Sequence, residues 1–229
     1  MTGVVDAELN DAGAGEADYR YVGTTSAMRQ LLLLLGLGLL LVVTAASAKD
    51  EKSIARFTEA MLEMSPAVDP TEAQQISEIA HRESRRLASE YRMVGFSGFQ
   101  SFLVNIGARE KGHCFHFAYD IGRKLRELPL RTLELHWGAA DPGTQLEHNV
   151  LIVTGTGQSI RDGYIIDGWR NSGRLLWKPV KTDSYKWGED FEETAWLQAG
   201  NPLRKINASV PSATPRKAAL TRKERAAPR

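Results

Sequence analysis

Apolar residues recur at a helical spacing in the first part of the chain. A short amphipathic helix is predicted from Ser53 to Met64, where the apolar positions lie three or four residues apart. A longer helix is predicted to begin at Asp69-Pro70, because aspartate caps a helix N-terminus and proline suits the first helical position. We expect Gly95 and Gly98 to end this helical part.

The pattern is clearest in a third helix, predicted to start at Cys114 and to end before Pro129. Five apolar residues share one of its faces: Cys114, Ala118, Ile121, Leu125 and Leu128. Beyond Pro129 the period changes to short apolar runs, which predict strands at 131–137, 148–153, 164–169 and 174–180. A last helix is predicted at 189–198. Helices followed by a mainly antiparallel sheet make the expected class α+β.

The N-terminal part has the features of a secretory signal. Residues 31–43 form an apolar run that follows Arg29 and precedes the small residues Ala46-Ser47-Ala48. We expect cleavage after Ala48 and export to the periplasm or the extracellular space. The alternative is an uncleaved inner-membrane anchor formed by residues 30–48. A translation start at Met28 would give the signal its usual position at the N-terminus.

Composition divides the chain into a leader (1–48), one domain (49–202) and a tail (203–229). The tail contains eight basic residues and one acidic residue, and we expect it to be disordered. The whole chain has 29 Lys and Arg against 28 Asp and Glu, so the domain itself carries no excess of positive charge. This excludes a basic nucleic-acid-binding domain. Membrane contact is expected only through an uncleaved leader or through the tail.

Cys114 is the only cysteine of the chain, so it cannot form an intramolecular disulfide. At the start of a helix, unpaired backbone N–H groups and the helix dipole favour a thiolate and would stabilise an oxyanion. These properties suit a nucleophile. An inert buried side chain and an intermolecular disulfide are the alternatives.

Two further residues suit the same chemistry. His148 opens an apolar strand, where an imidazole can accept the thiol proton and return it to a leaving amine. Asp167 lies in the otherwise apolar segment 164–169, and a buried carboxylate needs a partner. A histidine on the neighbouring strand would be that partner. We expect Gly168 to let the chain turn and Trp169 to form a wall of the site.

Together these residues resemble a known family. A cysteine at a helix start, a histidine at the head of a strand and Asp167-Gly168-Trp169 on the next strand are similar to the transglutaminase-like superfamily of the papain-like fold. The resemblance covers residues 99–180, which would be the catalytic core. It implies a Cys-His-Asp triad, a thioester acyl-enzyme, and hydrolysis or transfer of a peptide or protein amide, with a cell-envelope substrate as one option. It implies neither a metal nor an organic cofactor.

Several assignments stay open at this stage. The second oxyanion donor is not evident, and Gln100 and Trp137 are the candidates. His113 is expected near the site, where it would supply positive charge or compete for the role of base. A zinc site formed by His113 and His116 is a further alternative. The competing function is a catalytically inactive envelope binding or adaptor module on the same fold.

Overall fold

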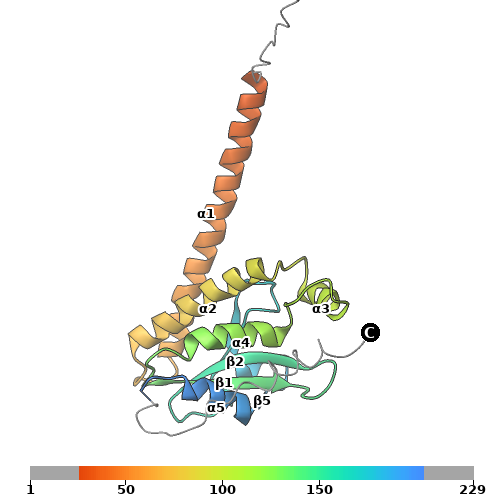
Figure 1. Ribbon diagram of the computed structural model, residues 1–229. Helices are drawn as coiled ribbons and strands as arrows, with labels where there is room; N and C mark the ends of the chain where they lie inside the picture. Colours follow the sequence, from red (N-terminus) through yellow and green to blue (C-terminus); the bar gives the residue numbers. More distant parts are fainter. Residues whose placement is uncertain (1–25, 204–229) are drawn as a thin grey trace, which may run out of the picture. The chain divides into compact units, whose positions relative to one another are not determined.

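The computed structural model describes residues 26–203, in two compact units divided between Ala46 and Ser47 (Figure 1). In the first unit, the described residues belong to helix α1 (Ser26–Leu62), which continues into the second unit. Within the described residues, no helix is both long and apolar enough to cross a bilayer. Most of the tail lies outside these residues, and the signal peptide and its cleavage stay predictions.

The second unit has a mixed α and β architecture. Its elements, in addition to the end of α1, are α2 (Pro70–Glu90), α3 (Ser97–Asn105), α4 (Cys114–Leu125), β1 (Leu133–Ala140), β2 (His148–Gly155), β3 (Tyr164–Asp167), β4 (Leu176–Pro179), β5 (Gly188–Glu189) and α5 (Phe191–Ala199). The strands form one sheet in the order β4-β3-β2-β1-β5. All neighbouring strands are antiparallel, so the predicted α+β class is confirmed.

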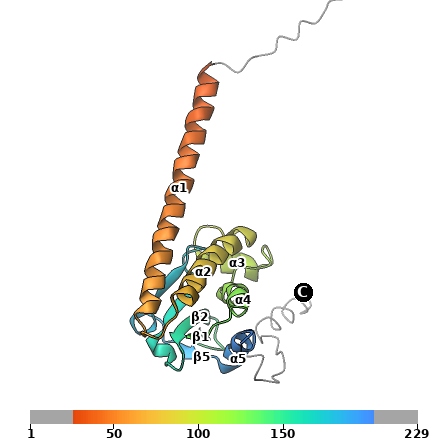
Figure 2. The same ribbon diagram turned by 90° about the vertical axis from the view of Figure 1, so that its left-hand side faces the viewer.

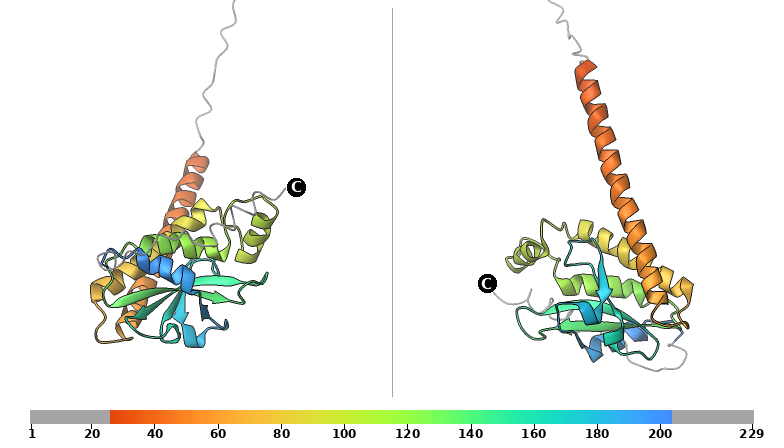
Figure 3. Two further views of the ribbon diagram at one scale, coloured as in Figure 1. Left: turned by 60° about the horizontal axis from the view of Figure 1, so that its bottom comes forward. Right: turned by 180° about the vertical axis from the view of Figure 1, so that it is seen from behind.

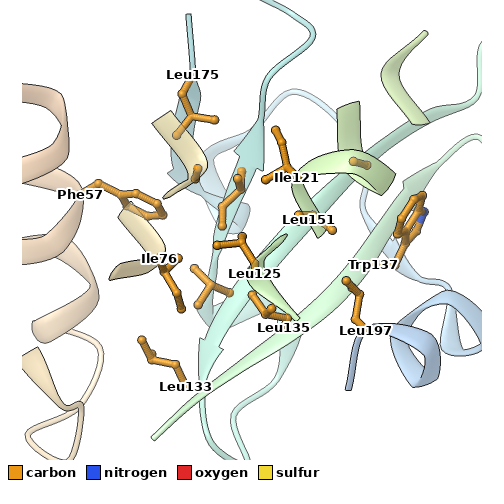
Figure 4. Packing of buried hydrophobic residues seen from close by; sticks show 14 of the residues in the cluster. Phe57, Ile76, Ile121, Leu125, Leu133, Leu135, Trp137, Leu151, Leu175 and Leu197 are labelled. Atoms are coloured by element: carbon orange, nitrogen blue, oxygen red, sulfur yellow. The ribbon is translucent and has the colours of Figure 1, made fainter. Parts of the chain in front are cut away.

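The central strand β2 is buried along its whole length, because β1 and β3 flank it and α4 covers it. Helix α4 lies between α2 and the sheet in several views (Figures 1, 2 and 3). Figure 4 shows Ile76 of α2, Leu125 of α4 and Leu135 of β1 meeting in one core. Phe57, near the end of α1, joins this core and stacks on Trp177 with ring centroids 4.9 Å apart. This layered packing fixes the start of α4 against the ends of β2 and β3.

The structure corrects some predicted boundaries. Helix α2 begins at Pro70 as predicted, and Asp69 accepts hydrogen bonds from Thr71 N and Glu72 N. Three predictions are wrong. The short helix expected from Ser53 to Met64 is the end of the longer helix α1 (Ser26–Leu62). Gly98 does not end the helical part, because it lies inside α3. A fifth strand, β5, occupies the place where the last helix was expected to begin, because Gly188 and Glu189 pair with β1.

Candidate active site

The fold brings Cys114, His148 and Asp167 together. Cys114 is the first residue of α4, His148 is the first residue of β2, and Asp167 is the last residue of β3. His148 Nε2 lies 2.8 Å from Asp167 Oδ2, and both side chains are buried. The thiol of Cys114 donates to the backbone oxygen of Glu147, which directly precedes His148, at 3.7 Å. Three residues from distant parts of the sequence therefore lie side by side.

The two imidazole nitrogens of His148 have different surroundings. Nε2 is bound to Asp167, while the buried Nδ1 has no hydrogen bond of ordinary geometry. Burial by itself lowers the pKa of His148, but interactions with Asp167 and with Cys114 outweigh it and raise the pKa to about 9. The thiol therefore lies within electrostatic reach of the imidazole, although the two groups form no hydrogen bond of ordinary geometry. Long or poorly aligned catalytic hydrogen bonds are common in active sites without substrate.

Asp167 is held by four donors. Its Oδ1 accepts from the backbone N–H groups of Trp169 and Arg170, at 2.8 and 3.0 Å. Its Oδ2 accepts from His148 Nε2 at 2.8 Å and from Arg170 Nε at 2.6 Å. Burial raises the pKa of Asp167, but the hydrogen bond and charge of His148 and the charge of Arg170 lower it below its usual value. The carboxylate therefore stays ionised in a fully buried position.

Arg170 links this carboxylate to a second one. Its guanidinium also binds both oxygens of Asp183, at 2.9 and 2.7 Å. Asp183 in turn accepts from the indole N–H of Trp187 at 2.9 Å. This arrangement fixes the segment 183–187 beside the imidazole of His148. Sequence reasoning missed Arg170 and Asp183, because neither falls in a periodic pattern.

Aromatic rings enclose the imidazole of His148. The ring centroids of Trp169, Tyr185 and Trp187 lie 5.0, 4.9 and 5.4 Å from its own centroid. Trp169 also donates from its indole N–H to the backbone oxygen of Gly112 at 2.9 Å, in the loop that leads to Cys114. Trp169 thus connects the loop of the nucleophile to the strand of the carboxylate.

A cavity of about 780 Å³ opens onto this group of residues. Cys114, His148, Trp169 and His113 all line it. The rest of its wall comes from α3, the start of α4, the β1–β2 loop and Tyr185: Gly98, Ser101, Asn105, Phe115, Gly143, Thr144, Gln145, Leu146, Glu147, Asn149 and Tyr185. A volume of this size accommodates a peptide segment or a small ligand. Sequence reasoning named neither the α3 wall nor the β1–β2 loop.

Gly168 has a different role from the one expected. Its backbone is not in the left-handed region that a glycine-specific turn requires. A Cβ at this position would instead lie 2.7 Å from Phe117 Cδ1 and 2.8 Å from Ser84 Oγ. Glycine therefore allows β3 to approach α2 and α4 closely, which brings Asp167 next to His148.

The structure does not place Gln100 and Trp137 on the cavity wall. Both are completely buried. Gln100 Nε2 donates to the backbone oxygens of Tyr91 and Lys111, at 2.9 and 3.1 Å. The indole N–H of Trp137 donates to Asn149 Oδ1 at 2.9 Å. Both donors are thus already used, Gln100 to hold the loop before Cys114 and Trp137 to orient Asn149.

The two histidines near Cys114 have separate roles. His113 lines the cavity, its Nδ1 lies 3.2 Å from Ser101 Oγ, and burial lowers its pKa. A lowered pKa favours a neutral imidazole at this position. His116 is buried, and its Nδ1 accepts from the backbone N–H groups of Gly112 and His113. In the part of the chain that the structure describes, no three His, Cys, Asp or Glu side chains gather as a metal site would require.

Comparisons with known proteins give no family for this chain. No protein-family model matches the sequence, and neither the curated proteins nor the solved structures give a match.

Proposed function

We propose that this chain is a cysteine-dependent amide hydrolase or acyltransferase on a papain-like, transglutaminase-like fold. The single observation that carries the proposal is the meeting of Cys114, His148 and Asp167, of which Cys114 and His148 line one cavity. Each has the chemistry of one role: nucleophile, acid and base, and orienting carboxylate. A buried cysteine that only packs would not need an imidazole and a carboxylate beside it.

The reactive ion pair forms by proton transfer from the thiol to His148 Nδ1, the nitrogen that has no hydrogen bond of its own. Asp167 holds Nε2–H and keeps Nδ1 directed to the sulfur. Because the charge of Cys114 contributes to the raised pKa of His148, an imidazolium and a thiolate stabilise each other in this site. At neutral pH, a pKa of about 9 keeps the imidazole protonated and ready to donate to the departing amine.

The thiolate attacks the carbonyl carbon of an amide, and the carbonyl oxygen becomes an oxyanion. The backbone N–H of Cys114 is among the first N–H groups of α4, which have no partner within the helix, and it would stabilise the oxyanion. His148 gives its proton to the departing amine, which leaves a thioester on Cys114. Water or a second amine then attacks the thioester while His148 accepts the proton of the attacking group. The free thiol and the acid or new amide are the products.

Alkylation of Cys114 with iodoacetamide, followed by intact mass, tests this proposal. We expect the wild-type thiol to react at pH 6.5, well below the value of ~8.5 typical of a free thiol. His148→Ala should slow this reaction by about tenfold or more, because the thiolate loses its partner. Asp167→Asn should slow it less, and Asp162→Asn, an exposed carboxylate elsewhere, should not change it.

Two results would contradict the proposal. One is reaction of the folded wild-type protein only near pH 8.5 and above, at the rate of the unfolded chain. The other is an unchanged rate in His148→Ala, which would favour the adaptor function. A peptide amide carrying an electrophilic trap should also add its acyl mass to wild type and not to Cys114→Ser.

We also propose export, which rests on the leader pattern alone. The substrate would then be a peptide or protein amide of the cell envelope. Intact mass of the protein from its native cell tests the location, because cleavage after Ala48 leaves Lys49 as the first residue. An unprocessed N-terminus would instead favour the anchored form.

A further inference from the structure

Helix α3 has its polar and apolar faces reversed relative to an ordinary surface helix. Its two buried residues, Ser97 and Gln100, are polar. Its large apolar side chains point outward instead: Phe99 and Phe102 are 43% and 53% exposed. The flanking residues Phe96 and Ile106 are 70% and 59% exposed. Surface helices normally bury such residues against the core.

The exposed side chains form one continuous strip. Phe96, Phe99, Phe102 and Ile106 are spaced three or four residues apart, which places them on one side of the helix. The ring centroids are 6.2 Å apart between Phe96 and Phe99 and 6.1 Å apart between Phe99 and Phe102. We call these four residues the α3 strip. Contiguous exposed apolar surface of this kind marks an interaction site.

Two basic side chains lie together beside the C-terminal end of α3. Arg92 precedes α3 and Arg109 follows it, and both line a second cavity of about 530 Å³. Among residues 26–203, neither guanidinium forms an ion pair, and the buried Arg109 Nε has no hydrogen bond. Two acidic residues, Glu90 and Glu110, line the same cavity. Glu90 pairs with Arg86 and Lys111 pairs with Asp120, which leaves two arginines against Glu110. The charge around the strip therefore suits an anionic partner.

We propose that the α3 strip, with Arg92 and Arg109, docks this domain on the surface of an anionic phospholipid bilayer. Helix α3 lies at the periphery of the domain (Figures 1 and 3), and its exposed strip suits insertion into a planar surface. Phenylalanine side chains enter the boundary between headgroups and acyl chains, while arginines bind the phosphates. This is peripheral binding by the domain and does not depend on the leader.

Docking would bring the mouth of the catalytic cavity to the membrane. Gly98, Ser101 and Asn105, on the other side of α3, line that cavity. Leu146, which also lines the cavity, is 78% exposed. The docked domain would therefore meet amides close to the bilayer surface.

Hydrogen–deuterium exchange of the full chain tests the proposal at the level of the α3 segment. The chain is placed in lipid discs of phosphatidylcholine alone, and in discs that also contain phosphatidylglycerol. We expect amides of residues 96–106 to exchange about tenfold more slowly in the anionic discs, with the protection lost at high salt. The same full chain is used with both discs, so the two samples differ only in the headgroup charge of the lipid.

Matched variants separate the two parts of the surface. Phe99→Ser with Phe102→Ser should abolish the protection, and Phe191→Ser, which changes an exposed phenylalanine on α5, should not. Arg92→Gln with Arg109→Gln should weaken it, whereas Arg131→Gln with Arg161→Gln should not. Unchanged exchange of the other segments and unchanged alkylation of Cys114 show that the variants are folded.

Other outcomes overturn the proposal. Equal exchange in neutral and anionic discs would exclude anionic lipid as the partner. Protection of residues 96–106 in lipid-free protein would show that a second copy or residues 204–229 cover the strip. If that protection is lost on dilution, a second copy covers the strip. If it persists on dilution, residues 204–229 cover the strip. None of these readings requires catalysis, so they leave the proposed function of Cys114 unaffected.

Discussion

Arg170 Nε donates to Asp167 Oδ2 at 2.6 Å, on the same oxygen that faces His148. Both donors share one carboxylate oxygen, and together they position the imidazole of His148. The arginine keeps the buried carboxylate charged, and the charged carboxylate holds the imidazole. Through Asp183, the same guanidinium also fixes the aromatic residues that surround this imidazole.

Removal of this guanidinium should therefore destabilise the domain. Arg170→Gln leaves Asp167 and Asp183, two buried carboxylates, without their main cation. We expect the free energy of unfolding to fall by about 3 kcal/mol, as for other broken buried ion pairs. Urea denaturation measures it. Arg161→Gln, an exposed control, should change stability by less than about 0.5 kcal/mol, and an equally small effect of Arg170→Gln would contradict the role given to it.

Stability should also depend on the charge of His148. Its pKa of about 9 in the folded protein lies above the ~6.5 of an unfolded chain. The protonated form therefore stabilises the fold fully below pH ~6.5, and this contribution is lost as the pH rises to about 9. The total is about 3 kcal/mol, from 1.36 kcal/mol for each pH unit.

The difference between the free energies of unfolding at pH 6.5 and at pH 9.5 measures this loss. The difference should be smaller in His148→Asn. Nuclear magnetic resonance titration of the imidazole provides the direct check. Because Cys114 and Asp167 both raise the pKa, it should fall in Cys114→Ser and in Asp167→Asn. A titration near 6.5 in the wild-type protein would refute the coupling of the three residues.

The close approach at Gly168 predicts a sensitive position. Gly168→Ala introduces a methyl group where Phe117, Ser84 and Ile121 already lie within 3.0 Å. We expect a loss of about 1–3 kcal/mol in stability, as for other overpacked sites, together with slower alkylation of Cys114. Gly188→Ala is the matched control, because its nearest neighbour, Ala139 O, would lie 3.7 Å away. Equal stability of the two variants would mean that β3 can move away without effect.

The indole N–H of Trp169 should contribute to stability and to the reactivity of Cys114, in addition to the contribution of its ring. Trp169→Phe retains an aromatic ring next to His148 but removes the hydrogen bond to Gly112 O. We expect a loss of about 1 kcal/mol in stability and slower alkylation of Cys114, because the loop before the nucleophile is released. Thermal denaturation and alkylation rates measure the two effects, and a variant indistinguishable from wild type would show that the loop is fixed by other contacts.

The sequence predicted those parts of the site that lie in regular elements. Cys114 begins a helix with a clear apolar face, and His148 and Asp167 interrupt apolar strands, so their positions followed from periodicity. Arg170 and Asp183 lie in irregular segments. They meet only because the chain folds back after β4, and spacing along the sequence carries no sign of this contact.

Helix α3 was missed for a different physical reason. A periodic pattern indicates a helix when its apolar side faces a core, and here that side faces outward. Gly95 and Gly98 therefore appeared to be stop signals. His81 shows the opposite case: it lies in a helix rich in charged residues, which favours a solvated side chain, but it is 3% exposed and contacts Ser77 O and Ser53 Oγ. Tertiary contacts overrode the local pattern in both cases.

The three aromatic rings around His148 have a magnetic consequence. Ring currents of Trp169, Tyr185 and Trp187 act on the carbon-bound protons of this imidazole and displace their chemical shifts from those of a solvated histidine. If segment 183–187 swings away when substrate arrives, two of these three ring currents disappear together. The chemical shift of one imidazole proton would then report both the protonation state of His148 and the movement of segment 183–187.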